Sequence, residues 1–169
     1  MRRAKEAIIG LGNYLLADEG VGLHAVHLLD KKLRNKDIDV ILGGTPGLNL
    51  LHEFDGRKKI IFIDAGNCGL EPGQYVRFRP GEVKSRKKTG RHSLHEFDLV
   101  TFLRFASRLL EAGKTDVIIY CIQPADIRVG DELSPVVKKS LLSLVNRVYG
   151  EALRDLKKED KDGKHIPRC

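Results

Sequence analysis

The chain has 169 residues, enough for one domain with a substantial core, and 41% of its residues are hydrophobic, as is usual for a globular protein. No apolar run approaches the ~20 residues that a membrane-spanning helix needs, and the run after the basic N-terminus breaks at Gly10, which argues against a signal peptide. Three widely spaced cysteines argue against a disulfide framework and predict a reducing, cytoplasmic setting.

The net charge of +7 invites a nucleic-acid interpretation, but the distribution of the charge weakens it. The segment from Arg77 to Arg91 holds seven basic residues and one acid, which is nearly the whole excess. One basic loop is more typical of a solvated face or a protein-docking patch than of a nucleic-acid platform. We therefore expect no nucleic-acid partner, and we expect a docking role for the loop.

Apolar periodicity predicts strands and helices that alternate along the chain. In the first part these are a strand at 7–10, a helix from Gly20, a strand at 38–42, a helix from Pro46 and a strand at 60–63. The second part predicts a short edge strand at 74–78, a helix at 94–112, a strand at 117–122 and a helix after the Ser134–Pro135 pair, which suits an N-cap and first turn. The charged tail at 157–169 has no apolar face, and we expect it to be flexible.

This alternation predicts a single α/β domain over residues 1–156: a three-layer α/β/α sandwich with a mostly parallel, twisted sheet of about five strands. In such folds the active site lies at the carboxyl ends of the strands. The turns at Gly12, 43–45, 64–66 and 121–124 all follow predicted strands. We therefore expect Glu19 and Asp64 to come near each other at one edge of the sheet.

The glycine-rich turn after the first strand does not fit a dinucleotide site. Gly10 and Gly12 match the usual fingerprint, but Leu15 stands at the third glycine position, and Asp18 and Glu19 would repel a pyrophosphate. The acids instead favour a cation.

Glu19 and Asp64 together with an imidazole would make a mixed oxygen and nitrogen ligand set, suited to nickel, zinc, manganese or iron. His92 and His95 both precede the helix predicted at 94–112, and the sequence pattern leaves the choice between them open. Among the other residues near this edge, we expect Asp18 to be structural, as a cap of the following helix. Cys68 lacks a matched base, so we do not expect it to be a nucleophile.

Five segments in order carry a resemblance to a known family. They are Gly-Leu-Gly-Asn-Tyr-Leu-Leu-Ala-Asp-Glu-Gly-Val-Gly at 10–22, Gly-Gly-Thr-Pro-Gly at 43–47, Ile-Asp-Ala-Gly at 63–66, Ser-Leu-His at 93–95 and Ile-Gln-Pro-Ala-Asp at 122–126. Over about residues 6–150 the sequence resembles the hydrogenase maturation proteases. The basic loop and the segment after Gly150 match no motif of that family.

The resemblance implies an endopeptidase that removes the C-terminal extension of the large-subunit precursor of a nickel–iron hydrogenase after nickel insertion. It implies metal contacts by Glu19, Asp64 and His95, which would also be the catalytic residues, and favours His95 over His92. The nickel would be supplied by the precursor, with no tightly bound cofactor. We expect Gly43, Gly44 and Thr45 to lie against the substrate chain, and Asn13 either to hold its turn or to orient substrate.

A different class of function remains open at this point. The same residues suit a non-catalytic metal-sensing chaperone that docks on a metalloenzyme precursor through the basic loop. Loss of the C-terminal extension from the precursor would distinguish the protease from the chaperone.

Overall fold

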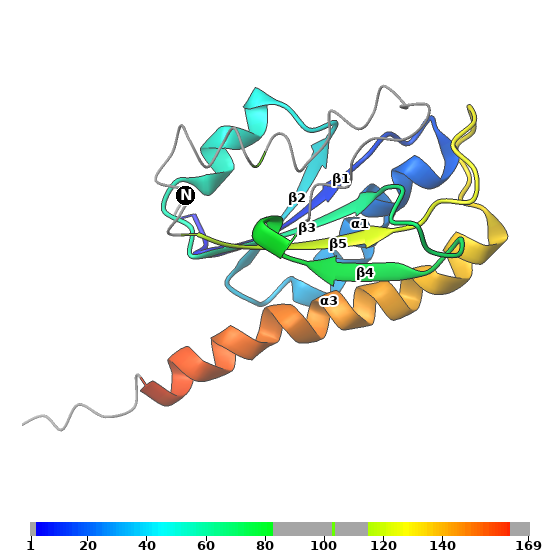
Figure 1. Ribbon diagram of the computed structural model, residues 1–169. Helices are drawn as coiled ribbons and strands as arrows, with labels where there is room; N and C mark the ends of the chain where they lie inside the picture. Colours follow the sequence, from blue (N-terminus) through cyan, green and yellow to red (C-terminus); the bar gives the residue numbers. More distant parts are fainter. Residues whose placement is uncertain (1–2, 83–102, 104–114, 163–169) are drawn as a thin grey trace, which may run out of the picture.

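The computed structural model describes residues 3–82, 103 and 115–162, with side chains as far as Arg154. A five-stranded sheet has the order β2-β1-β3-β5-β4 (Figure 1). Its strands are β1 (Glu6–Leu11), β2 (Ile38–Gly44), β3 (Lys59–Ala65), β4 (Tyr75–Phe78) and β5 (Asp116–Ile122). The pairs β1–β2, β1–β3 and β3–β5 are parallel, and β4 runs antiparallel to β5 at the edge. The mostly parallel sheet and the edge position of the 74–78 strand are confirmed.

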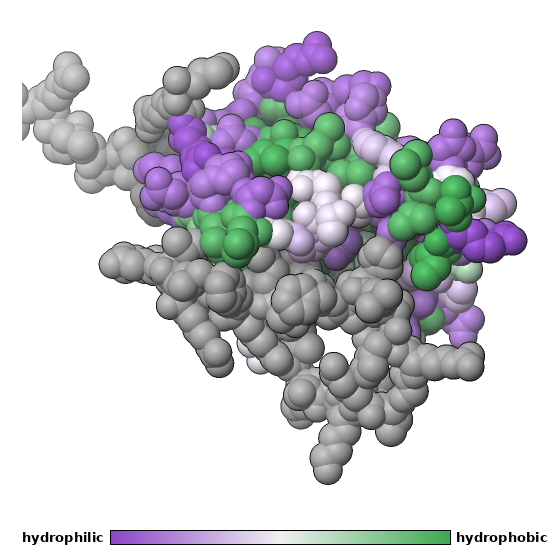
Figure 2. All heavy atoms as spheres, turned by 90° about the horizontal axis from the view of Figure 1, so that it is seen from above, coloured by the Kyte–Doolittle hydropathy of each residue, from purple (hydrophilic) through white to green (hydrophobic). Residues whose placement is uncertain are grey.

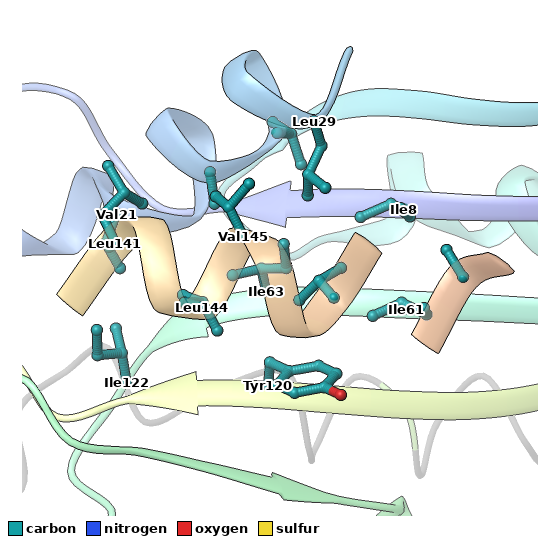
Figure 3. Close-up of a cluster of buried hydrophobic side chains, with 14 of the residues drawn as sticks. Ile8, Val21, Leu29, Ile61, Ile63, Tyr120, Ile122, Leu141, Leu144 and Val145 are labelled. Atoms are coloured by element: carbon teal, nitrogen blue, oxygen red, sulfur yellow. The ribbon is translucent and has the colours of Figure 1, made fainter. Parts of the chain in front are cut away.

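Helices α1 (Val21–Leu33) and α3 (Pro135–Asp162) cover one face of the sheet. On that face the apolar side chains of β1, β3 and β5 meet those of both helices (Figure 3), including Ile8, Ile61, Ile63, Tyr120, Val21, Leu29, Leu144 and Val145. The run Ile60–Ile63 is buried throughout because its alternate side chains enter two different apolar layers.

The opposite face is covered by the 3-10 helix η2 (Leu48–Phe54) and by Leu103. The helix predicted after Pro46 is therefore present as a 3-10 helix. Of the helix predicted at 94–112, only Leu103 lies within the described residues; it is helical and packs with Ile9, Phe62 and Ile119.

Two further short 3-10 helices complete the described elements, η1 (Ala17–Gly20) before α1 and η3 (Pro80–Glu82) after β4. Helix α3 runs on to Asp162, past the boundary that the sequence suggested for a separate tail. In the described part of the chain, no helix combines the length and apolarity needed to cross a bilayer.

Candidate functional site

The carboxyl ends of four parallel strands lie at one edge of the sheet, as predicted. The register pairs Gly10 with Ile63, Asp64 with Cys121, and Leu11 with Gly44. The turns after β1, β2, β3 and β5 consequently leave the sheet on the same side (Figure 1). This edge is where the predicted site residues of the described chain gather.

Glycines allow close backbone contacts between the turn after β1 and η1, and between α1 and β3. Gly12 has a φ of +125°, and a Cβ on it would lie 1.7 Å from the carbonyl oxygen of Glu19. A Cβ on Gly22 would lie 2.3 Å from the carbonyl oxygen of Ile63. Only glycine fits at such separations. The residues beside Glu19 and Asp64 are thereby held together, and η1 packs against β3.

Glu19 and Asp64 occupy neighbouring elements at this edge. Glu19 lies in η1 and Asp64 near the end of β3, and both are half-buried. By strand alternation Asp64 lies on the same face as Phe62, the face that η2 and Leu103 cover. One Asp64 oxygen accepts a hydrogen bond from the N–H of Ala65 at 2.9 Å.

His95 and its rival His92 lie outside the described residues. Leu103, from the same predicted helix, packs on the sheet face to which Asp64 belongs. Within residues 3–82, 103 and 115–162, no group of three or more His, Cys, Asp or Glu side chains is arranged to hold a metal. The third proposed ligand, His95, therefore lies outside the residues that the structure describes.

Asp18 is structural, but not as the predicted helix cap. Its side chain is fully buried and accepts hydrogen bonds from the N–H groups of Ala125 and Asp126, both at 2.9 Å. It also accepts from the N–H of Ser134 at 2.7 Å and from the Ser134 hydroxyl at 2.8 Å. Gly20 occupies the N-cap of α1, with no side-chain cap hydrogen bond. Asp18 therefore ties η1 to the loop between β5 and α3.

The loops on either side of Asp18 are also joined through their backbones. Leu16 and Gly130 form a parallel bridge, in which Ala17 donates to the carbonyl of Gly130 at 2.6 Å. Ala17 adopts a φ of +44°, which a non-glycine residue rarely takes. The segment that carries Glu19 is thus held to the loop between β5 and α3 both by the Asp18 side chain and by the backbone of Leu16 and Ala17.

The four predicted substrate-binding residues differ in their surroundings. Asn13 stabilises its own turn, because its side-chain oxygen accepts a hydrogen bond from the N–H of Leu15 at 2.9 Å. A Cβ on Gly43 would lie 2.7 Å from the Ile9 side chain, so packing alone explains this glycine. Gly44 has a φ of +64° with open space around it, and Thr45 is exposed. Substrate contact by these residues stays a prediction.

A pair of thiols at the same edge was not predicted. The sulfurs of Cys68 and Cys121 are 2.7 Å apart and share a hydrogen bond. This hydrogen bond lowers the pKa of Cys68, because the Cys121 thiol stabilises the Cys68 thiolate; the same bond and burial raise the pKa of Cys121. Sequence inspection missed this pair because local patterns do not give the strand register. The register pairs Cys121 with Asp64 and thereby brings it beside the segment that follows β3.

Exposed apolar side chains flank the Glu19 segment. Leu15 is 67% exposed and Val129 is 89% exposed, and the bridge between their loops brings them to the same region. Figure 2 shows hydrophobic residues gathered at the end of the molecule toward which the parallel strands point. Exposed apolar residues gathered at one end of a protein are typical of a binding region.

The predicted basic loop loses part of its free charge in the structure. Arg77 and Arg79 belong to or follow β4, and they pair with Glu151 at 3.1 Å and Asp116 at 2.9 Å. The remaining basic residues of the loop lie outside the described residues, so its docking role stays a prediction.

Comparisons with known proteins agree with the fold and with the motifs. The family model described as hydrogenase maturation protease matches residues 23–151. The hydrogenase expression/formation protein HupD of Bradyrhizobium diazoefficiens is 33% identical over 79% of this chain and 70% of its own length. HoxM of Azotobacter vinelandii is 30% identical over 88% of this chain and 76% of its own.

Solved structures give the same result. The NiFe hydrogenase maturation protease HybD from Thermococcus kodakarensis is 28% identical, with a TM-score of 0.71 over 88% of this chain and 99% of that one. The hydrogenase maturating endopeptidase HybD from E. coli is 24% identical, with a TM-score of 0.70 over 89% and 93% of the two chains, and shares the fold.

Proposed function

This chain belongs to the hydrogenase maturation protease family, and from that membership we propose that it removes the C-terminal extension of a nickel–iron hydrogenase large-subunit precursor after nickel insertion. The proposed residues are Glu19, Asp64 and His95, which recognise the nickel already held by the precursor. The observation that carries the proposal is the backbone contact by which Gly12 and Gly22 set the Glu19 segment against the strand bearing Asp64.

The ligand chemistry supports recognition of a metal that another protein supplies. Two carboxylates and an imidazole suit nickel, and three exchangeable ligands are too few for a closed structural site. Leu103 packs on the sheet face to which Asp64 belongs, and this is the face on which the proposal requires His95.

The proposed reaction is hydrolysis of one peptide bond of the precursor. Nickel held in the precursor would polarise the scissile carbonyl or lower the pKa of a water molecule. Glu19 or Asp64, whichever is not a ligand at that moment, accepts the proton of the attacking water. The half-buried position of both carboxylates supports this role, because each remains accessible to a substrate.

The precursor would dock beside this edge. The exposed Leu15 lies on the segment that carries Glu19, and the Leu16–Gly130 bridge joins the loop of the exposed Val129 to it; this supports both as contacts for apolar residues of the precursor. The basic loop would add a salt-sensitive contact. We therefore propose the precursor as the partner. We propose no nucleic-acid partner, and we propose the cytoplasm as the location.

The test is incubation of the protein with nickel-loaded and nickel-free precursor, followed by mass measurement of the precursor. We expect the nickel-loaded form alone to be shortened. Glu19→Gln, Asp64→Asn and His95→Ala should each abolish shortening while the thermal midpoint stays nearly unchanged; His92→Ala is the matched control and should stay active. Binding of both precursor forms without shortening of either would favour the metal-sensing chaperone instead.

A further inference from the structure

Two thiols lie at the functional edge and take no part in the proposed ligand set. Cys121 is in β5, where it pairs in register with Asp64, and Cys68 is on the segment that follows β3. Their sulfurs are 2.7 Å apart, although the residues are 53 positions apart in the chain. A disulfide bond is ~2.05 Å long, so about 0.7 Å of further approach separates the pair from a covalent bond.

The backbone around the pair is already held in place. The N–H of Gly66 donates to the carbonyl of Ile122 at 3.0 Å, and the N–H of Cys68 donates to the side-chain oxygen of Gln123 at 2.9 Å. These hydrogen bonds join the Cys68 segment to the end of β5 on both sides of the sulfurs. The two thiols therefore face each other without a change in the strands.

Gly66 leaves the space that the Cys121 sulfur occupies. A Cβ on Gly66 would lie 2.9 Å from that sulfur, closer than ordinary packing allows. Both cysteines are free, and neither is fully buried; Cys68, the less buried of the two, is the thiol that a small reagent meets first. The segment is thus shaped to bring the sulfurs together at an accessible position.

We propose that Cys68 and Cys121 are an oxidation site that closes to a reversible disulfide next to Asp64. The oxidant is a low-molecular-weight disulfide of the glutathione class. The Cys68 sulfur, as thiolate, attacks one sulfur of the oxidant and displaces a thiolate, which leaves a mixed disulfide on Cys68. Cys121, after losing its proton, attacks the Cys68 sulfur and displaces the second thiolate.

In the balanced reaction the two protein thiols lose two hydrogens and two electrons, and one molecule of the oxidant becomes two thiols. A dithiol reductant reverses the process. The bond links the segment that follows Asp64 to the neighbouring strand, so the thiol–disulfide balance of the surroundings sets how firmly that segment is held.

The test uses the full chain, reduced and then equilibrated with oxidised glutathione. We expect loss of two hydrogens in mass, a linked pair of peptides containing Cys68 and Cys121, and a rise of about 10 °C in the thermal midpoint, since the link constrains a long loop of the unfolded chain. Added dithiol should remove all three effects.

Three variants separate this pair from other thiol chemistry. Cys68→Ser and Cys121→Ser should each lose the link and the rise in midpoint, and Cys169→Ser should keep both. A stable glutathione adduct on Cys68 that Cys121 does not displace would overturn the proposal, as would a link that requires Cys169. These readouts are independent of precursor processing, so they do not depend on the proposed function.

Discussion

Asp18 and Glu19 are adjacent acids, the first with a structural role and the second with a proposed functional role. Replacing Asp18 tests the structural role by itself. The Asp18 carboxylate satisfies the N–H groups of Ala125, Asp126 and Ser134. Asp18→Ala would leave these three donors without that partner. An unsatisfied buried donor costs ~1–3 kcal/mol, and these sites are partly buried, so the lower end applies to each. We expect a loss of about 3 kcal/mol in the free energy of unfolding.

Urea unfolding, followed by far-ultraviolet circular dichroism, measures this loss. Asp131 gives a matched control, because it is an exposed acid on the loop that Asp18 holds; Asp131→Ala should change stability by less than about 0.5 kcal/mol. Glu19→Gln should likewise change stability little. A loss below about 1 kcal/mol for Asp18→Ala would refute the assignment of Asp18 as the buried tie between η1 and the loop before α3.

Two further variants test the close backbone contact at Gly12 and the interactions of Glu151, the acid of α3 that pairs with Arg77. Gly12→Ala should destabilise the fold by at least ~2 kcal/mol, because of its φ of +125° and the clash with Glu19; Gly81→Ala, with open space around it, should be near neutral in the same urea experiment. Burial raises the pKa of Glu151, but hydrogen bonds from Arg77 and Tyr120 outweigh it, so the folded-state pKa is lowered. This stabilisation is present above the ordinary glutamate pKa and is lost as the pH falls through the lower folded value. Glu151→Gln should therefore cost ~1–2 kcal/mol near neutral pH, and its difference from the parent protein should shrink on acidification; a constant difference across pH would contradict this.

Local patterns were sufficient for most of the fold. The all-apolar run at Ile60–Ile63 predicts a strand covered on both faces, and the structure buries it between two apolar layers. The common edge of the parallel strands followed from the same patterns. The helix after Pro46 was predicted, but apolar spacing over one or two turns does not distinguish a 3-10 helix from an α-helix, and Leu48–Phe54 is 3-10.

Contacts between distant segments were beyond local patterns. Asp18 precedes a helix, which suggests a cap, but its partners lie 107 to 116 positions later. Cys68 looked isolated because its neighbour Cys121 is set by strand register. The charge of Arg77 and Arg79 looked free because their acidic partners lie on β5 and α3. In each case the decisive partner lies far along the sequence, on β5, on α3 or in the loop between them.

The tie made by Asp18 has a consequence for the order of folding. Among the described residues, the donors to its carboxylate come from the loop at 125–134, so the Asp18 tie cannot form in a growing chain until this later part has left the ribosome. Closing so long a loop also slows refolding, since its entropy is lost before the contacts form. The Glu19 segment therefore gains this tie only after all five strands of the sheet have been synthesised.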